Sequence, residues 1–130
     1  MKSTNDIVAL VARIGLAAIY LISGLGKLAA HEGTVGYIAS VGLPAPEFGY
    51  WVAIVVEVLG GLAILTGFKT KIVAPVMAVF TVAAALAFHN DFGDQNQMIH
   101  FLKNIAIAGG FLQLYVSGPG ALSLDNRKAA

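Results

Sequence analysis

The chain has 130 residues, of which 58% are hydrophobic and only 12% are charged. A soluble domain carries about 25% charged residues, and so short a chain cannot bury this much apolar surface in its own core. The composition therefore excludes a soluble domain and predicts an integral membrane protein. The sequence has no cysteine, which excludes disulfides and thiolate metal sites, and its net charge of +1 does not favour a nucleic-acid partner.

Four segments are apolar enough to cross the hydrocarbon core of a bilayer, which takes about 20 residues of helix. They run over residues 7–28, 49–68, 72–89 and 98–116. Residues 69–71 form so short a turn that the spans on either side must be antiparallel neighbours. The sequence predicts one all-α domain, residues 1–130, built as an antiparallel bundle of four membrane helices.

The first loop, residues 29–48, is long and only half polar. Within it, residues 34–41 fit a short amphipathic helix that lies flat at the outer membrane surface. Gly42 and the two prolines that follow, Pro44 and Pro46, end this helix.

Lysine and arginine in short loops predict the orientation of a membrane protein, because cytoplasmic loops carry an excess of them. Five such residues share one side of the predicted bundle: Lys2, Lys69, Lys71, Arg127 and Lys128. Four acidic residues gather on the other side: Glu32, Glu47, Asp91 and Asp94. Both termini are therefore predicted to be cytoplasmic.

Charged side chains inside the spans are candidate functional residues, because they are costly in lipid unless they are paired. Arg13 and Lys27 lie in the first span, Glu57 in the second and Lys103 in the fourth. Helical periodicity places each of them beside small residues, which let membrane helices approach closely. We expect these polar stripes to face one another inside the bundle.

Glu57 is the only acid inside a span, and its natural partners are Lys103 and Lys27. The depths of Glu57 and Lys103 predict that these two form the polar centre. Two interpretations of the cluster stay open. It is either a buried ion pair that only fixes helix register, with Lys27 and Arg13 snorkelling towards water, or a site for a ligand, a quinone head group or a proton.

Three histidines, His31, His89 and His100, lie near the predicted outer side together with Asp91. A metal site needs three or four convergent ligands, and histidines and aspartates at a membrane interface are usually solvated or cap helices. We therefore predict no metal site and no haem. The residues imply no cofactor firmly, and quinone is the one ligand hypothesis.

Five blocks of sequence, in this order and spacing, resemble the DoxX family of small bacterial inner-membrane proteins with four spans. The blocks are Arg13–Leu16 with Ser23–Leu28, Tyr37–Pro44, Glu57–Leu62 with Gly67, Phe88–His89, and Phe101–Gly110 followed by Gly118–Gly120 and Ser123–Asp125. By this resemblance, the characteristic polar positions of the family are Arg13, Lys27, Glu57, His89, Lys103 and Asn104, which become the candidate site residues.

The resemblance implies a multi-pass inner-membrane protein that serves a redox or stress-response system as an accessory subunit or ligand-binding component, and not a stand-alone enzyme. Its expected partners are the lipid bilayer, a membrane or periplasmic redox protein, and further copies of the chain. Two alternatives stay open. One is a transporter or channel for a small solute or proton, which would need an oligomer because no paired repeats are visible. The other is a purely structural membrane tether.

Overall fold

The computed structural model describes residues 3–127, and over this range it contains helices and no strand. Four helical stretches are long and apolar enough to cross a membrane. They are α1 (Thr4–Ala29), the continuous run of α3 (Pro46–Ile54), η1 (Val55–Leu59) and α4 (Gly60–Thr66), α5 (Thr70–Phe88), and α6 (Gln95–Ser117). The four-helix membrane fold is confirmed, with every span boundary within three residues of its predicted place.

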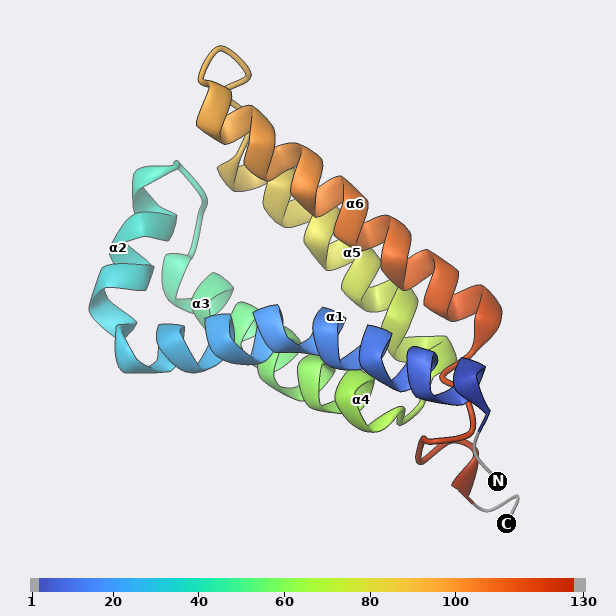
Figure 1. The fold of residues 1–130 in the computed structure, drawn as a ribbon. Helices are drawn as coiled ribbons and strands as arrows, with labels where there is room; N and C mark the ends of the chain where they lie inside the picture. The colour runs from blue at the N-terminus through green and yellow to red at the C-terminus, as the bar shows by residue number, and fades with distance from the viewer. Residues whose placement is uncertain (1–2, 128–130) are drawn as a thin grey trace.

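The four spans are arranged as two antiparallel pairs (Figure 1). α1 lies along α3, η1 and α4, and α5 lies along α6. The pairs meet at one end, where α4 packs on α5 and the main core contains the fully buried side chains of Ile64, Met77 and Phe111. Towards the other end the pairs diverge, which gives the molecule the shape of a V (Figure 1). We call the end at which the pairs meet the terminal end, because α1 begins and α6 ends there. The opposite end, where the pairs diverge, is called the lid end.

The lid end is crossed by α2 (His31–Ser40), which follows α1 after a single residue. Ile38 of α2 is buried against Tyr50 and Ile54 of α3, and the ring of Tyr37 stacks on Phe88 of α5 with centroids 5.4 Å apart. A helix in the first loop is therefore confirmed, although it begins three residues before its predicted start. It packs on both helical pairs because its apolar side chains find partners there.

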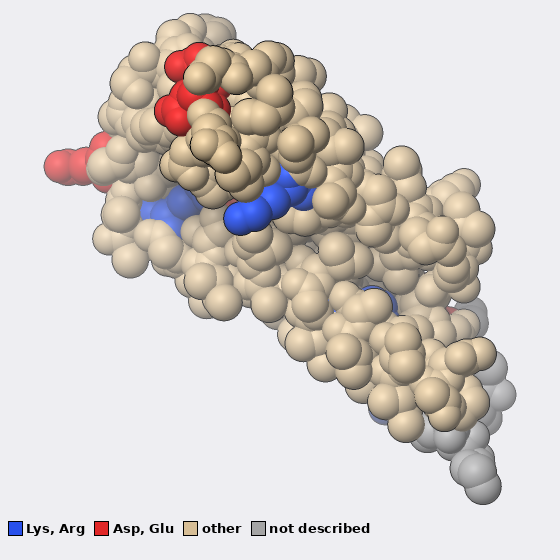
Figure 2. Space-filling view, turned by 45° about the horizontal axis from the view of Figure 1, so that its top comes forward, with Lys and Arg blue, Asp and Glu red and all other residues tan. Residues whose placement is uncertain are grey.

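The flanks of the four spans are apolar and exposed, as lipid contact requires. Ile22, Val79 and Val116, which come from three different spans, are 70–73% exposed. Figure 2 shows a surface with few charged side chains, on which most of the visible acidic groups lie at the lid end. The protein therefore presents its helices to the lipid bilayer.

Arg13 organises the terminal end. Its side chain is completely buried, and its guanidinium group donates hydrogen bonds to the carbonyl oxygens of Leu65 at 2.7 Å, Pro119 at 3.0 Å, Ile64 at 3.3 Å and Leu122. Arg13 does not snorkel, as the register-fixing interpretation expected, because the segment after α6 folds back over α1 and α4 and covers the side chain. Arginine suits this position because its planar fork carries five donors.

The same segment caps α5 through Asp125. The carboxylate of Asp125 accepts hydrogen bonds from the backbone N–H groups of Lys69 at 2.6 Å and Thr70 at 2.8 Å. Burial by itself raises the pKa of Asp125, but the hydrogen bonds from Thr70 and Lys69 and the charge of Lys69 outweigh burial, so the net pKa is lowered. The ionised carboxylate is thus the form that the fold favours.

We expect the Asp125→Asn substitution to destabilise the protein by about 1 kcal/mol at pH 7, as the loss of a helix cap does. Because the folded pKa lies below the unfolded pKa of about 3.9, this cost should shrink as the pH falls below about 4. Thermal unfolding in detergent at pH 7 and pH 3 measures it. Glu32→Gln, at an exposed position on α2, is the control, and a cost for Asp125→Asn that does not change with pH would contradict the capping role.

Candidate functional site

A cavity of about 430 Å³ lies between the two helical pairs, beneath α2. Its lining comes from α1, α2, α3, η1, α5 and α6 and is mostly apolar, and it includes several small residues, among them alanines of α5 and Gly49 and Ala53 of α3. The volume falls in the range of about 300–1,000 Å³ that is typical of small-molecule sites, which are also mainly apolar with a few polar groups. The cavity exists because the two pairs pack only near the terminal end.

Four of the six candidate residues line this cavity: Lys27, Glu57, His89 and Asn104. Arg13 lies instead at the terminal end, where it holds backbone carbonyls. Lys103 is exposed on α6 and forms no ion pair within residues 3–127. The structure thus brings together four of the predicted polar residues and separates the other two from them.

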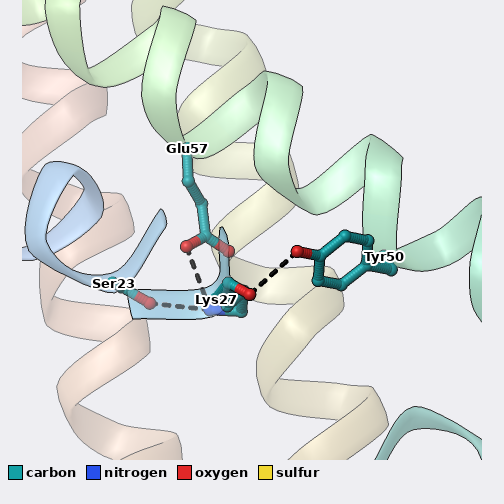
Figure 3. A network of polar contacts seen from close by, with 4 residues as sticks. All are labelled: Ser23, Lys27, Tyr50 and Glu57. Carbon is teal, nitrogen blue, oxygen red and sulfur yellow. Dashed lines mark hydrogen bonds and ion pairs between the residues drawn. The ribbon is translucent and has the colours of Figure 1, made fainter. Parts of the chain in front are cut away.

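The predicted pairing of Glu57 with Lys103 is wrong, because the partner of Glu57 is Lys27 (Figure 3). The Nζ atom of Lys27 lies 3.0 Å from Oε1 of Glu57 and also donates to Oγ of Ser23 at 2.7 Å. The side chain of Glu57 is only 6% exposed, whereas that of Lys27 is 28% exposed. Lys103 does not reach this acid because α6 packs on α5, in the other helical pair.

The local structure of the second span positions Glu57. Residues 55–59 form one turn of π-helix, η1, and Glu57 lies at its centre. Such turns are rare and often occur at functional sites. Opposite η1 stands Gly24 of α1, where a Cβ atom would lie 2.8 Å from Cγ2 of Val58 and 3.2 Å from Cβ of Glu57. The missing side chain of Gly24 therefore lets η1 come close enough for Glu57 to meet Lys27.

A second polar group joins the two helical pairs on the side of the cavity nearer the terminal end. The hydroxyl groups of Tyr20 on α1 and Thr81 on α5 are hydrogen bonded, and Thr81 also donates to the carbonyl of Met77 at 2.6 Å. The amide of Asn104 on α6 donates to the carbonyl of Thr81 at 3.2 Å. Tyr20 and Thr81 were not among the predicted site residues. Tyr20 could have been predicted, because it lies on the same face of α1 as Lys27. Nothing in the sequence marks Thr81, an uncharged residue in a span, as part of the site.

Each of the three histidines at the lid end contacts another polar side chain. The rings of His89 and His100 stack with centroids 5.1 Å apart, and Nε2 of His31 lies 2.8 Å from Oε1 of Glu47. Within residues 3–127, no group of three or more histidine, aspartate or glutamate side chains could hold a metal ion. Of these histidines, His89 is the one that lines the cavity.

Comparison with known proteins shows which family this chain belongs to. The DoxX family model matches residues 8–90, which run from the second turn of α1 past the end of α5 and include most of the cavity lining. The chain belongs to the DoxX family. The match confirms the family that the sequence blocks predicted.

Two Escherichia coli proteins resemble this DoxX-family chain over almost their whole length. Inner membrane protein YqjF is 41% identical over 125 residues, which cover 96% of this chain and 95% of YqjF, and inner membrane protein YphA is 40% identical over 130 residues, which cover 96% and 93%. A putative oxidoreductase of Bacillus subtilis, CatD, is 30% identical over 86 residues, or 66% of this chain and 63% of CatD. No solved structure matches the chain. Together with the four spans, these relatives identify a multi-pass inner-membrane protein.

Proposed function

We propose that this DoxX-family protein is the ligand-binding component of a redox-linked membrane system, and that the cavity beneath α2 binds a quinone-type ring. The observation that carries the proposal is the place of the Lys27–Glu57 pair, which lies in the wall of an apolar cavity and not in a closed core. An ion pair that only fixes helix register gains nothing from an adjacent empty space. In the wall of a cavity, the same ion pair can form charged hydrogen bonds with a bound ring.

The ammonium group of Lys27 supplies the contact. Of its three N–H donors, one is directed to Ser23 and one to Glu57. The third remains for a ligand, and a quinone carbonyl is a neutral acceptor that it can reach without bringing another charge into lipid. The surrounding small and apolar side chains accept a flat ring.

The redox link is supported by the relative that is named a putative oxidoreductase. The chain has no cysteine and thus no redox-active dithiol of its own. We therefore assign only the binding of the ring to this chain. The electron transfer is assigned to a partner protein in the membrane or the periplasm.

The test is equilibrium dialysis of a short-chain ubiquinone against the purified protein in lipid nanodiscs. We expect saturable binding, and a loss of about tenfold in affinity for Lys27→Met, because a hydrogen bond from a charged donor is worth about 1.5–3 kcal/mol. Lys103→Met removes the same charge outside the cavity and should bind like the wild type. Equal losses in both variants, or no saturable binding to the wild type, would overturn the proposal.

We also propose that the terminal end faces the cytoplasm, because two lysines lie there: Lys69 in the turn between α4 and α5, and Lys71 in the first turn of α5. Alkaline phosphatase, which is active only outside the cytoplasm, reports the orientation. We expect it to be inactive when fused after Asp125 and active when fused after Gly93, in the loop between α5 and α6. The opposite pattern of activity would reverse the orientation.

A further inference from the structure

We infer that Glu57 makes this site prefer the reduced, hydroxyl-bearing form of the ring, so that the ligand held most tightly is a quinol. The inference rests on the proposed function and adds the redox state of the ligand to it. It starts from the carboxylate oxygen that the ion pair leaves unused. Oε1 of Glu57 accepts the hydrogen bond from Lys27, whereas Oε2 accepts none from residues 3–127 (Figure 3).

Oε2 is nevertheless accessible. The buried side-chain oxygen and nitrogen atoms without a hydrogen-bond partner in the described chain belong to Thr70 and His89, and Oε2 of Glu57 is not among them. Glu57 as a whole is only 4% exposed, and the space that it borders is the cavity. The unused lone pairs of Oε2 are therefore open to a ligand in the cavity and almost closed to other surroundings.

The cavity wall thus carries a donor and an acceptor side by side. The donor is the third N–H of Lys27, and the acceptor is Oε2 of Glu57. A quinone presents only acceptor oxygens, so it can satisfy Lys27 but places lone pairs against the carboxylate. A quinol presents hydroxyl groups, which accept from Lys27 and also donate to Glu57.

The two residues consequently differ in what they distinguish. The ammonium group of Lys27 binds an oxygen of either redox form, so it contributes to affinity without selecting between the forms. The carboxylate of Glu57 forms a charge-assisted hydrogen bond with a hydroxyl group only, and such bonds are about twice as strong as neutral ones. Glu57 is therefore the residue that determines the specificity of the site for the reduced ring.

The test measures the affinity of the nanodisc-embedded protein for two probes under anaerobic conditions. They are 2-methyl-1,4-naphthoquinone and the corresponding 1,4-dihydroxynaphthalene, which is kept reduced. We expect the wild type to bind the dihydroxy form at least tenfold more tightly. In Glu57→Gln, the affinity for the dihydroxy form should fall about tenfold and that for the quinone should stay equal or rise, because the amide can donate to a carbonyl.

Ser23→Ala is the matched control, because it removes the other partner of Lys27 and leaves Glu57 in place. Both affinities should change together, and the ratio between them should stay that of the wild type. Binding of the quinone by Glu57→Gln also shows that its cavity is intact. If that variant binds neither probe, the ratio is measured in the Lys27→Met/Glu57→Gln double variant, which leaves no unpaired charge.

The outcomes separate this inference from the proposed function. Equal affinities of the wild type for both probes, or a tenfold preference that survives in Glu57→Gln or in the double variant, overturn the selective role of Glu57 and leave the ring-binding function standing. If the wild type binds neither probe, this inference fails, and the proposed function fails with it if the short-chain ubiquinone is not bound either.

Discussion

Replacing Arg13 with methionine is expected to lower the free energy of unfolding by about 3–5 kcal/mol. The guanidinium group satisfies four backbone carbonyls from α4 and from the segment after α6. Methionine fills a similar volume but donates no hydrogen bond, and a buried acceptor that loses its donor costs about 1–3 kcal/mol. Equilibrium unfolding in mixed detergent micelles measures the loss.

Two further variants make the Arg13 result specific. Arg13→Lys keeps the charge but lacks the planar fork of donors, so it should recover only part of the lost stability. Lys103→Met removes an exposed charge and should change stability by no more than about 0.5 kcal/mol. If Arg13→Met were as stable as Lys103→Met, Arg13 would not hold the terminal end together.

The Lys27–Glu57 pair should show an asymmetric loss of stability. Lys27→Met leaves the carboxylate of Glu57, only 6% exposed, without a partner, and we expect a cost of about 3 kcal/mol. Glu57→Gln leaves an ammonium group that keeps Ser23 and is 28% exposed, so the cost should be about 1 kcal/mol. The same unfolding measurement in detergent compares the two variants.

The double variant Lys27→Met/Glu57→Gln should regain much of the loss, because neither charge is then unpaired. We expect a coupling energy of about 1–3 kcal/mol between the two positions. The matched cycle uses Lys103→Met with Glu57→Gln, whose effects should add within about 0.5 kcal/mol, since α6 lies in the other helical pair. Strict additivity for Lys27 and Glu57 would show that the ion pair contributes nothing to the fold.

Ligand binding by the same double variant distinguishes the two interpretations of the charged cluster. If the pair only fixes helix register, the variant should regain every property along with its stability. If the pair forms the wall of a ring-binding site, stability returns and the affinity for the ring does not. Our proposal expects the second result.

The fold class was predictable because it depends on local properties of the sequence. Apolar stretches of the right length produced spans that the structure confirms within three residues at each end. The starts of α1 and α6 are local features too, because the side chains of Ser3 and Asp94 each accept a backbone hydrogen bond there. The family was predictable for the same reason, since its motifs are contiguous blocks of residues.

The π-helical turn and the cavity were not predictable in this way. A π-turn adds one residue to a helical turn, and nothing in the composition of residues 55–59 marks it. The cavity depends on the divergence of the two helical pairs, which is a property of their packing. Small residues beside the charged ones were expected to allow close helix approach, but only the fold showed that η1 is the neighbour of one of them, Gly24.

The choice between Lys27 and Lys103 as the partner of Glu57 marks the limit of the sequence by itself. The sequence determined which charged residues lie inside the spans and how deep each lies along its helix, because depth follows from counting residues. Only the tertiary structure decided which helices are neighbours: η1 lies on α1, and α6 lies on α5. Ion pairs form over a few ångströms across helices, and similar depth does not bring two side chains together when their helices belong to different pairs.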